Sequence, residues 1–247
     1  MNPIEQFKEE RLQNMQHMKR DRELQNKSLD WMLHADKYKY IYNFNWMGRP
    51  IIKFPQDIIA LQELIWQVKP DLIIETGIAH GGSIIFSASM LELLGNDGKV
   101  IAVDIDIRKH NREEIERHPM MKRITMLEGS SVSTQIVQQM ADYAKGFKNV
   151  MICLDSNHTH QHVLDELRLY APLVSMNSYI ILPDTLIEFF PKGYYSHNRP
   201  WDVGDNPYTA MEAFLKENKD FVKDESITDK LLITEAYSGG FLKRIKQ

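Results

Sequence analysis

Acidic side chains and glycines follow an apolar run in one short segment, DLIIETGIAHGGS at residues 71–83. Residues 72–74 are of the continuous apolar type that is typical of a central parallel strand buried on both faces. The acidic Glu75 ends this run, and the glycines behind it let the backbone approach a ligand closely. These glycines are Gly77, Gly81 and Gly82. The segment therefore predicts a buried strand that breaks into a cofactor-binding loop.

The spacing of this loop distinguishes between two cofactor classes. It reads Glu75-x-Gly77-x-x-x-Gly81-x-Ser83, whereas a dinucleotide site uses G-x-G-x-x-G to place the pyrophosphate at a helix N-terminus. The spacing thus argues against a nicotinamide dinucleotide. A class I methyltransferase uses such a loop for S-adenosylmethionine, whose ammonium group Glu75 can bind directly or through water. We expect cofactor contacts from Glu75, Gly77, Ala79 and Ser83.

A second apolar run, KVIAVDID at residues 99–106, ends in two carboxylates. At this distance from the first glycine, an acidic side chain of a nucleotide-binding α/β fold accepts hydrogen bonds from a ribose diol. We assign that role to Asp104 and expect Ile105 beside it to contact the cofactor. Asp106 lies on the same side of the extended chain but further out, as a solvated strand end would.

A short polar segment, Glu128-Gly129-Ser130-Ser131, closes the third expected strand. In a methyltransferase such a segment borders the adenine, so we include Glu128, Gly129 and Ser130 among the cofactor contacts. The alternative is a turn in which Ser130 or Ser131 caps the following helix.

Two further strand ends carry residues that suit metal binding. The fourth expected strand ends at Asp155 and the fifth at Asp184-Thr185, and the carboxyl ends of neighbouring parallel strands meet at one crevice. We therefore predict that Asp155 and Asp184, with Thr185 beside them, hold a divalent cation such as Mg²⁺, and that Asp155 also reaches the cofactor. The alternative is strand-end capping without a metal.

Histidines follow the fourth strand at residues 158, 160 and 162. His158 is the candidate general base, because a neutral imidazole titrates near neutral pH and this one lies three residues beyond Asp155. The run H-T-H-Q-H also raises a histidine zinc site, but the chain has neither an H-E-x-x-H helix nor a cysteine pair. For His160 we expect a hydrogen bond at the start of a helix instead.

The elements that position these residues alternate regularly between residues 54 and 182. Five apolar runs of strand length alternate with helical patterns, which predicts a parallel sheet with right-handed crossovers and ligand sites at the carboxyl ends of its strands. The first helix opens at Pro55 and stops at Pro70.

The last third of the chain has a different pattern. Residues 189–206 are rich in aromatic residues, proline and glycine without periodicity, so we predict a lid or substrate loop over about residues 186–206. Asn206 caps a short helix that opens at Pro207. Closing strands are expected at residues 221–223, 231–234 and 241–245, with an antiparallel hairpin among them.

Composition limits the class of protein. The 247 residues are 43% hydrophobic and suit one large domain, residues 53–247, with an appended segment at residues 1–52. The net charge of −4 gives no basic footprint for nucleic acid, so a small or carbohydrate-like acceptor fits better. The single cysteine, Cys153, excludes an intramolecular disulfide framework. The charged N-terminus and the lack of a membrane-length apolar run favour a cytoplasmic protein.

The charged first 27 residues carry a sparse apolar spacing that is compatible with a helix lying on another surface. We expect this segment to serve packing, subunit contact or substrate contact rather than catalysis. The alternative is a solvated helix or a frayed terminus. The apolar positions are Ile4, Phe7, Leu12, Met15 and Met18.

Taken together, these motifs resemble the cephalosporin hydroxylase and rhamnosyl O-methyltransferase family. The resemblance runs from about Tyr40 to Lys246, most of the chain. It is carried by NFNWMGRPIIKFPQDIIALQELIW at residues 43–66, DLIIETGIAHGGS at residues 71–83, VIAVDIDIR at residues 100–108, LDSNHTHQHVLDELRLYAPLVS at residues 154–175 and RPWDVGDNP at residues 199–207.

The resemblance implies an α/β fold of the Rossmann-like class I methyltransferase type. Its sheet has seven mostly parallel strands, helices on both faces and a C-terminal antiparallel hairpin. It further implies S-adenosylmethionine, often Mg²⁺, and a homo-oligomer. The expected activity is transfer of a methyl group to a hydroxyl of a sugar, polysaccharide or small natural product. Trp46, Arg49, Tyr194, Arg199 and Trp201 are expected to shape the acceptor pocket, with ordinary packing as the alternative for the aromatic residues.

One departure from the family pattern affects the metal site. Many relatives have V-E-D-T at the end of the fifth strand, where this chain has Leu182-Pro183-Asp184-Thr185. Pro183 removes a potential carboxylate ligand, so a cation would be weaker, differently held or absent. This departure keeps open a second hypothesis, a catalytically weak cofactor-binding partner subunit of an oxygenase or biosynthetic complex. A nicotinamide-dependent oxidoreductase is a third and weaker alternative, and no 2-His-1-carboxylate iron motif is recognisable.

Overall fold

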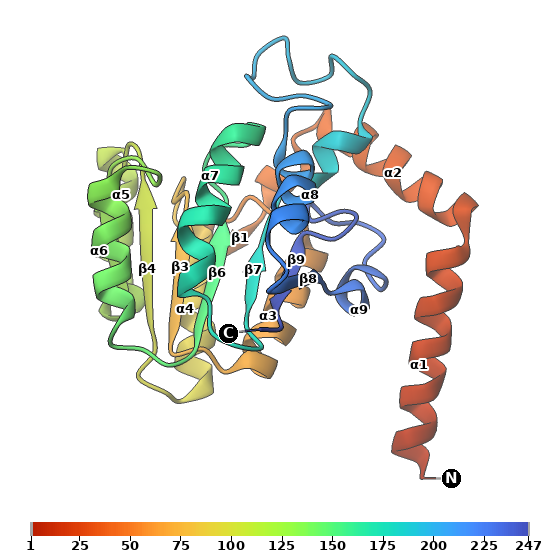
Figure 1. The fold of residues 1–247 in the computed structure, drawn as a ribbon, viewed down its shortest axis with the longest axis horizontal. Coiled ribbons are helices and arrows are strands. Elements are labelled where there is room, and N and C mark those ends of the chain that lie inside the picture. The colour runs from red at the N-terminus through yellow and green to blue at the C-terminus, as the bar shows by residue number, and fades with distance from the viewer. Residues whose placement is uncertain (1, 247) are drawn as a thin grey trace.

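A seven-stranded sheet forms the centre of the molecule (Figure 1). The structure is a computed structural model that describes residues 2–246. The strand order is β5-β4-β3-β6-β7-β9-β8, in which β3 to β7 run parallel and β9 pairs antiparallel with both β7 and β8. The strands are β3 (Leu72–Thr76), β4 (Lys99–Asp104), β5 (Ile124–Glu128), β6 (Val150–Leu154), β7 (Tyr179–Ile181), β8 (Phe221–Lys223) and β9 (Phe241–Arg244).

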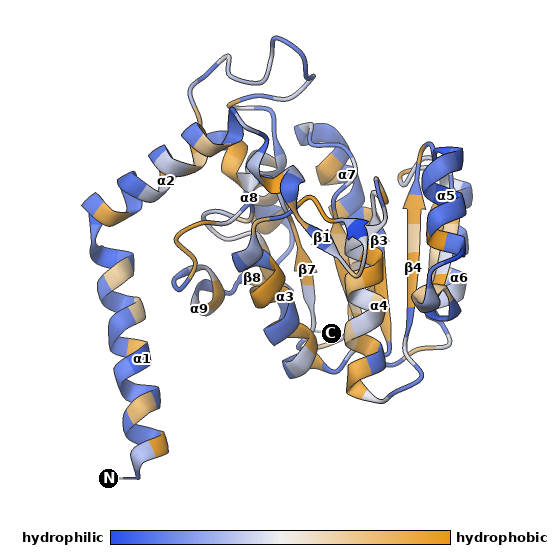
Figure 2. Cartoon of the chain, turned by 180° about the vertical axis from the view of Figure 1, so that it is seen from behind, coloured by the Kyte–Doolittle hydropathy of each residue, from blue (hydrophilic) through white to orange (hydrophobic). Residues whose placement is uncertain are grey.

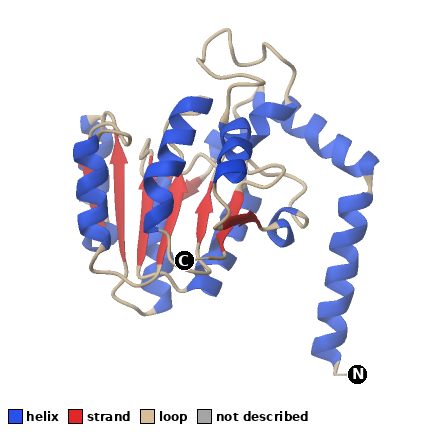
Figure 3. Cartoon of the chain, in the orientation of Figure 1, coloured by secondary structure: helices blue, strands red, loops and turns tan. Residues whose placement is uncertain are grey.

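Helices cover both faces of this sheet (Figure 3). One core joins the sheet to α3 (Pro55–Val68), α4 (Gly82–Leu94) and α5 (Lys109–Glu116). The other joins it to α6 (Thr134–Ala144), α7 (His160–Tyr170) and α8 (Pro207–Glu217). Side chains of β3 alternate between the two cores, since Leu72 and Ile74 lie in the second and Ile73 in the first. This alternation explains why residues 72–74 are all apolar. The predicted α/β fold is confirmed.

The order of the strands creates a switch point between β3 and β6. The chain leaves β3 toward β4 on one side and returns to β6 on the other, which is where open α/β sheets bind ligands. The register places Thr76 level with Val103 of β4 and Leu154 of β6. Gly77, Asp104 and Asp155 therefore follow at the same edge of the sheet.

One expected strand is wrong. Residues 231–234 form a loop, because Thr234 turns into the protein and its hydroxyl donates to the buried carboxylate of Asp57. The apolar residues there are explained by packing, since Leu231 contacts the core beside α3. The predicted C-terminal antiparallel hairpin is present as β8 and β9, which flank this loop and the short helix α9 (Glu225–Thr228).

The N-terminal segment consists of two helices with different environments. Helix α1 (Pro3–Arg20) extends away from the sheet (Figure 2), and none of its described side chains is buried. Helix α2 (Arg22–Asp36) packs through Met32 against Phe54, Leu186 and Phe190. The division at residue 52 stays a prediction, as does the oligomer contact expected of α1.

Short elements complete the chain. A small hairpin, β1 (Asn45–Trp46) and β2 (Arg49–Pro50), precedes α3. Single 3₁₀ turns occur at η1 (Tyr40–Asn43), η2 (Pro119–Arg123), η3 (Ala171–Leu173) and η4 (Thr185–Phe189). The loop that follows η4, expected to be a lid, projects beyond the carboxyl ends of the strands (Figure 1). Within residues 2–246, no helix combines the length and the apolar character needed to cross a membrane.

Candidate active site

Residues 77–82, which connect β3 to the first residue of α4, depend on glycine at position 77. Gly77 has φ +87°, and a Cβ there would lie 1.9 Å from the carbonyl oxygen of Asp155. Any side chain would therefore separate β3 from the end of β6. We call residues 77–82 the glycine loop. Its close approach to Asp155 joins the predicted cofactor and metal segments into one site.

Side chains outside the glycine loop hold its backbone in place. Asp104 accepts hydrogen bonds through Oδ2 from the N–H groups of Ile78 (2.8 Å) and Ala79 (3.1 Å). On the other side, Arg49 donates from Nε and Nη2 to the carbonyl of His80, at 3.0 and 2.8 Å. Asp104 thus orients the loop. The predicted hydrogen bonds from a ribose would go to the same carboxylate, which already accepts hydrogen bonds from these two backbone N–H groups. Arg49 thus holds the backbone of the loop, and its predicted contribution to the acceptor pocket stays a prediction.

Glu75 is almost completely buried, with 2% of its surface exposed. Burial raises its pKa to about 7, although Lys53 and the hydroxyl of Ser83 act in the opposite direction. A carboxyl group with this pKa can change its charge near neutral pH. Its position at the end of β3 agrees with the prediction of a contact to a cationic cofactor group, which stays a prediction.

The ends of β4 and β5 differ in exposure. Ile105 is 71% exposed although it is apolar, and it lies directly beyond Asp104 at the edge where the cofactor is expected. Glu128 pairs with Arg112 at 2.7 Å. The helix cap in this segment is Ser133, whose hydroxyl accepts from the N–H of Ile136, so neither Ser130 nor Ser131 caps α6. The end of β5 is therefore not used to cap α6, and the predicted cofactor contacts of Glu128, Gly129 and Ser130 stay a prediction.

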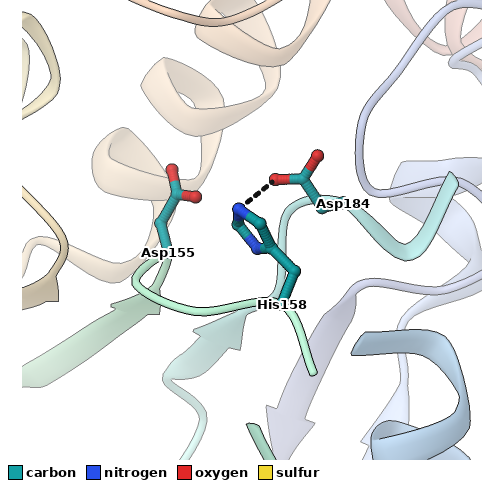
Figure 4. A group of neighbouring side chains, drawn as sticks. All are labelled: Asp155, His158 and Asp184. Carbon is teal, nitrogen blue, oxygen red and sulfur yellow. Dashed lines mark ion pairs between the residues drawn. The ribbon is translucent and has the colours of Figure 1, made fainter. Parts of the chain in front are cut away.

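Asp155, His158 and Asp184 meet at the carboxyl ends of β6 and β7, and we call them the carboxylate–histidine cluster (Figure 4). One ligand atom from each lies within 4.8 Å of the others. The Nε2 atom of His158 lies 3.5 Å from Oδ2 of Asp184. Asp184 has φ +60°, a strained conformation for a residue with a side chain and one that is common at functional sites. Thr185 is not part of the cluster, because its hydroxyl donates to the carbonyl of Tyr237 at 2.6 Å.

Lys53 lies at the candidate site and was not among the residues predicted for it. Its side chain is 2% exposed, and its ammonium lies 3.0 Å from Oδ2 of Asp155 and 3.8 Å from Oε2 of Glu235. Burial lowers the pKa of Lys53, but these carboxylates outweigh burial and hold it well above its usual value. In turn, burial raises the pKa of Asp155, and Lys53 and then His158 reverse this and keep it below its usual value. The signal was available, because lysine is seldom fully buried without a partner and this one interrupts the apolar run PIIKF.

Further carboxylates surround Lys53 without a matching positive charge. Glu235 is buried, and burial together with Asp184 and Asp57 raises its pKa well above the usual value despite the opposing effect of Lys53. Burial likewise raises the pKa of Asp57 to about 6. For Asp184, burial and then Asp155 raise the pKa, and His158 opposes the shift. A divalent cation would balance this excess of negative charge, and the oxygen-rich donor set suits Mg²⁺.

Comparison with known proteins identifies the family. The sequence pattern of the rhamnosyl O-methyltransferase/CmcI family matches residues 38–245. The chain belongs to this family. Rhamnosyl O-methyltransferase of Mycobacterium tuberculosis (strain ATCC 25618 / H37Rv) is 30% identical over 221 residues, which cover 85% of this chain and 84% of that protein. The Mycobacterium leprae (strain TN) protein of the same name is 27% identical over 201 residues, 81% and 82% of the two chains.

Solved structures share the fold at lower sequence identity. The structure of CmcI with Mg and SAM has a TM-score of 0.57 at 18% identity, covering 83% of this chain and 78% of the other. The O-methyltransferase from Bacillus cereus in complex with SAH has a TM-score of 0.54 at 16% identity, covering 89% and 91%. The predicted family, the class I methyltransferase fold and the O-methyltransferase class are therefore confirmed.

In this member of the rhamnosyl O-methyltransferase/CmcI family, the histidines at 158, 160 and 162 have separate surroundings. Nδ1 of His160 lies 2.8 Å from the hydroxyl of Thr209, in agreement with a hydrogen bond at the start of α7. His162 lies between the hydroxyls of Ser131 and Ser156. Among residues 2–246, the carboxylate–histidine cluster is the only group of three metal-binding side chains found, so the three histidines do not form a zinc site.

The aromatic residues expected at the acceptor pocket of this family member divide into two groups. Trp201 lies edge-on to His158, with ring centroids 4.6 Å apart. Tyr194 reaches the same side and donates to Asp36 at 2.9 Å. By contrast, Trp46 packs on Phe86 of α4 and donates to Ser89, so packing explains it.

Proposed function

We propose that this chain transfers the methyl group of S-adenosylmethionine to a sugar hydroxyl at the carboxylate–histidine cluster. The observation that carries this proposal is the meeting of that cluster with the glycine loop at the switch point between β3 and β6. The curated relatives named above are rhamnosyl O-methyltransferases, which supports a sugar as the acceptor. The wider class of acceptor is a hydroxylated small natural product, and a sugar is the member of that class that we propose.

The described residues fit the cofactor at the glycine loop. Gly77 provides a backbone without a side chain, and Glu75 provides a buried carboxyl beneath it for a cationic group. Ile105 offers an exposed apolar surface for a flat ring at the end of β4. When bound, S-adenosylmethionine supplies an electrophilic methyl group on a sulfonium. The protein binds and orients this group, which makes the reaction effectively intramolecular.

The same region fits a divalent cation. Asp155 and Asp184 each supply a carboxylate, and water with a substrate hydroxyl would complete the coordination that Mg²⁺ requires. Lys53 engages Oδ2 of Asp155 and leaves the other oxygen available. A bound cation would lower the pKa of an acceptor hydroxyl. Because Pro183 supplies no second carboxylate, Asp184 must serve alone at the end of β7.

In this proposal His158 receives the proton of the acceptor. The acceptor O–H bond breaks, the proton passes to His158, and the oxygen electron pair forms the new bond to the methyl carbon. The bond between that carbon and sulfur breaks, and its electrons remain on sulfur as a neutral thioether. Asp184, 3.5 Å from Nε2, stabilises the imidazolium that results. Trp201 restrains the ring from its other side.

Paired binding and transfer assays test this proposal. We expect His158→Ala to lower methyl transfer by about 10²–10⁴-fold, while calorimetry shows S-adenosylmethionine binding retained. His17→Ala, on the exposed helix α1, is the matched control and should transfer normally. The assay follows labelled methyl into a panel of rhamnosyl and glucosyl glycosides, with and without Mg²⁺. Cofactor binding without transfer to any acceptor would overturn the proposal and favour a partner subunit.

A further inference from the structure

A small cavity lies beside the carboxylate–histidine cluster. Its volume of about 30 Å³ admits a group of one or two heavy atoms rather than a sugar ring. Asp184 belongs both to the lining of this cavity and to the cluster. A substituent placed in the cavity would therefore belong to a molecule that also reaches the reacting centre. The lining residues that the argument uses are Asp36, Tyr40, Phe54, Phe190, Tyr195 and Glu235, together with Asp184.

Aromatic rings from separate parts of the chain form much of the cavity wall. Tyr40 comes from η1 and Phe54 from the start of α3, and their ring centroids lie 6.1 Å apart. Phe190 and Tyr195 come from the loop after η4 and are stacked with centroids 5.9 Å apart. The faces of such rings attract cations through their quadrupoles, most strongly where water is excluded.

Three carboxylates also line the cavity, beside the aliphatic side chains of Met32, Ile41 and Leu186, and no lysine or arginine is among the described lining residues. Glu235 is 5% exposed, and no residue that the structure describes donates a hydrogen bond to its carboxylate. Lys53 lies 3.8 Å from Oε2 of Glu235 but donates to Asp155. Asp36 accepts one hydrogen bond, from the hydroxyl of Tyr194. The one charged partner of Glu235 is thus shared with Asp155 and distant, and a ligand with several N–H groups would supply closer hydrogen bonds to this carboxylate.

We propose that this cavity binds the protonated amine of the acceptor, so that the preferred acceptor is an amino sugar rather than a neutral one. An ammonium group supplies three N–H donors and a positive charge, which match the carboxylates and the aromatic wall. Since Asp184 faces both cavity and cluster, the amine lies on a carbon near the hydroxyl that is methylated. This inference rests on the proposed function and adds the class of substrate.

Three probes that differ in one group test the inference. Methyl α-D-glucosaminide carries an ammonium, its N-acetyl derivative a neutral amide, and methyl α-D-glucoside a hydroxyl at the same carbon. Each is titrated by calorimetry into the full-length protein saturated with S-adenosylhomocysteine and Mg²⁺. We expect the amine to bind about tenfold more tightly than either neutral probe. Equal binding of the three, or binding of none, would overturn the inference.

Two variants assign the preference to the cavity. Glu235→Gln and Asp36→Asn keep the shape of each side chain and remove its charge, and each should reduce the preference for the amine to about twofold or less. Asp97→Asn, in the turn before β4, is the matched control and should keep the full preference. Asp36 is only partly buried, so this variant still tests the inference if Glu235→Gln unfolds. A preference that survives in a folded variant would contradict the assignment.

Failure of this inference can be separated from failure of the proposed function. Labelled methyl transfer to neutral glycosides, with no advantage for amines, would leave the methyltransferase intact and remove the amine cavity. Tight amine binding without transfer to any glycoside would keep the cavity and remove the proposed function.

Discussion

The two sides of the candidate site are held by different forces. On the cofactor side, formed by β3, β4 and β5, the glycine loop is fixed by hydrogen bonds to its backbone from Asp104 and Arg49. On the acceptor side, formed by β6, β7 and the N-terminal helix α2, buried charges and aromatic rings predominate. The first arrangement depends on the positions of backbone groups. The second depends on the charge of each side chain, so substitutions there should have larger effects.

The largest expected effect follows from removing the buried cation on the acceptor side. Lys53→Met leaves Asp155 and Glu235 buried without their ammonium, which should lower the free energy of unfolding by about 3–5 kcal/mol. Lys122→Met is the control, because Lys122 pairs with Glu92 at the surface and should lose less than about 1 kcal/mol. Urea unfolding followed by tryptophan fluorescence measures both. Similar losses of unfolding free energy in the two variants would show that the buried ion pairs of Lys53 stabilise the protein no more than the surface ion pair of Lys122.

A pH-dependent effect should arise where the two sides meet, at Glu75. Its pKa is raised from 4.5 to about 7 by burial, so folding favours the protonated form. The associated stability is complete below pH 4.5 and is lost as the pH rises through about 7, a change of about 3 kcal/mol. Glu75→Gln cannot titrate and should lack this loss. The unchanged protein and Glu75→Gln both retain Asp57, so the difference between their unfolding free energies from pH 4 to 8 reports on Glu75 alone. The same dependence on pH in both proteins would contradict the prediction.

On the cofactor side, the expected effect depends on backbone contact. Gly77→Ala places a methyl group against the carbonyl of Asp155, whereas Gly193 has nearly the same φ, +86°, and no atom within 4 Å of its added Cβ. Both substitutions incur the strain of a positive φ. Only Gly77→Ala must also push strands apart, so it should be less stable than Gly193→Ala by about 1–3 kcal/mol. Thermal unfolding measures the difference, and cofactor binding should weaken in Gly77→Ala alone. Equal stability of Gly77→Ala and Gly193→Ala would show that the glycine loop moves to accommodate the added methyl group without cost.

The contrast between the two sides also explains what the sequence predicts. The glycine loop and the strand-end acids at 104, 155 and 184 follow local patterns, in which an apolar run gives way to a polar residue at a fixed position. Because the strands are parallel, their carboxyl ends meet at one edge of the sheet, and no long-range contact has to be known to predict this. For the same reason the order of strands and helices from residue 54 to 182 was predictable, as was the closing hairpin.

Residues that reach the site over long distances in the chain were not predictable in this way. The apolar run around Lys53 indicates its burial, but Glu235 is 182 positions away and no local pattern indicates that the two charges meet in the interior. The same folding of residues 231–235 against Asp57 turned an apolar segment that resembles a strand into a loop. Thr185 was placed in the metal site by adjacency to Asp184, but its hydroxyl points to the backbone at Tyr237.

The smallest expected effect separates two tryptophans that the sequence had grouped together. Trp46→Phe loses the hydrogen bond to Ser89 and should cost about 1 kcal/mol of stability without changing methyl transfer, because Trp46 packs on α4. Trp201→Phe should leave stability nearly unchanged but lower kcat/KM by up to about tenfold, since its edge contact restrains His158. Unfolding and transfer assays on both variants therefore give opposite patterns. If Trp46→Phe impaired transfer as much as Trp201→Phe, the acceptor side would have to extend across the glycine loop to β1.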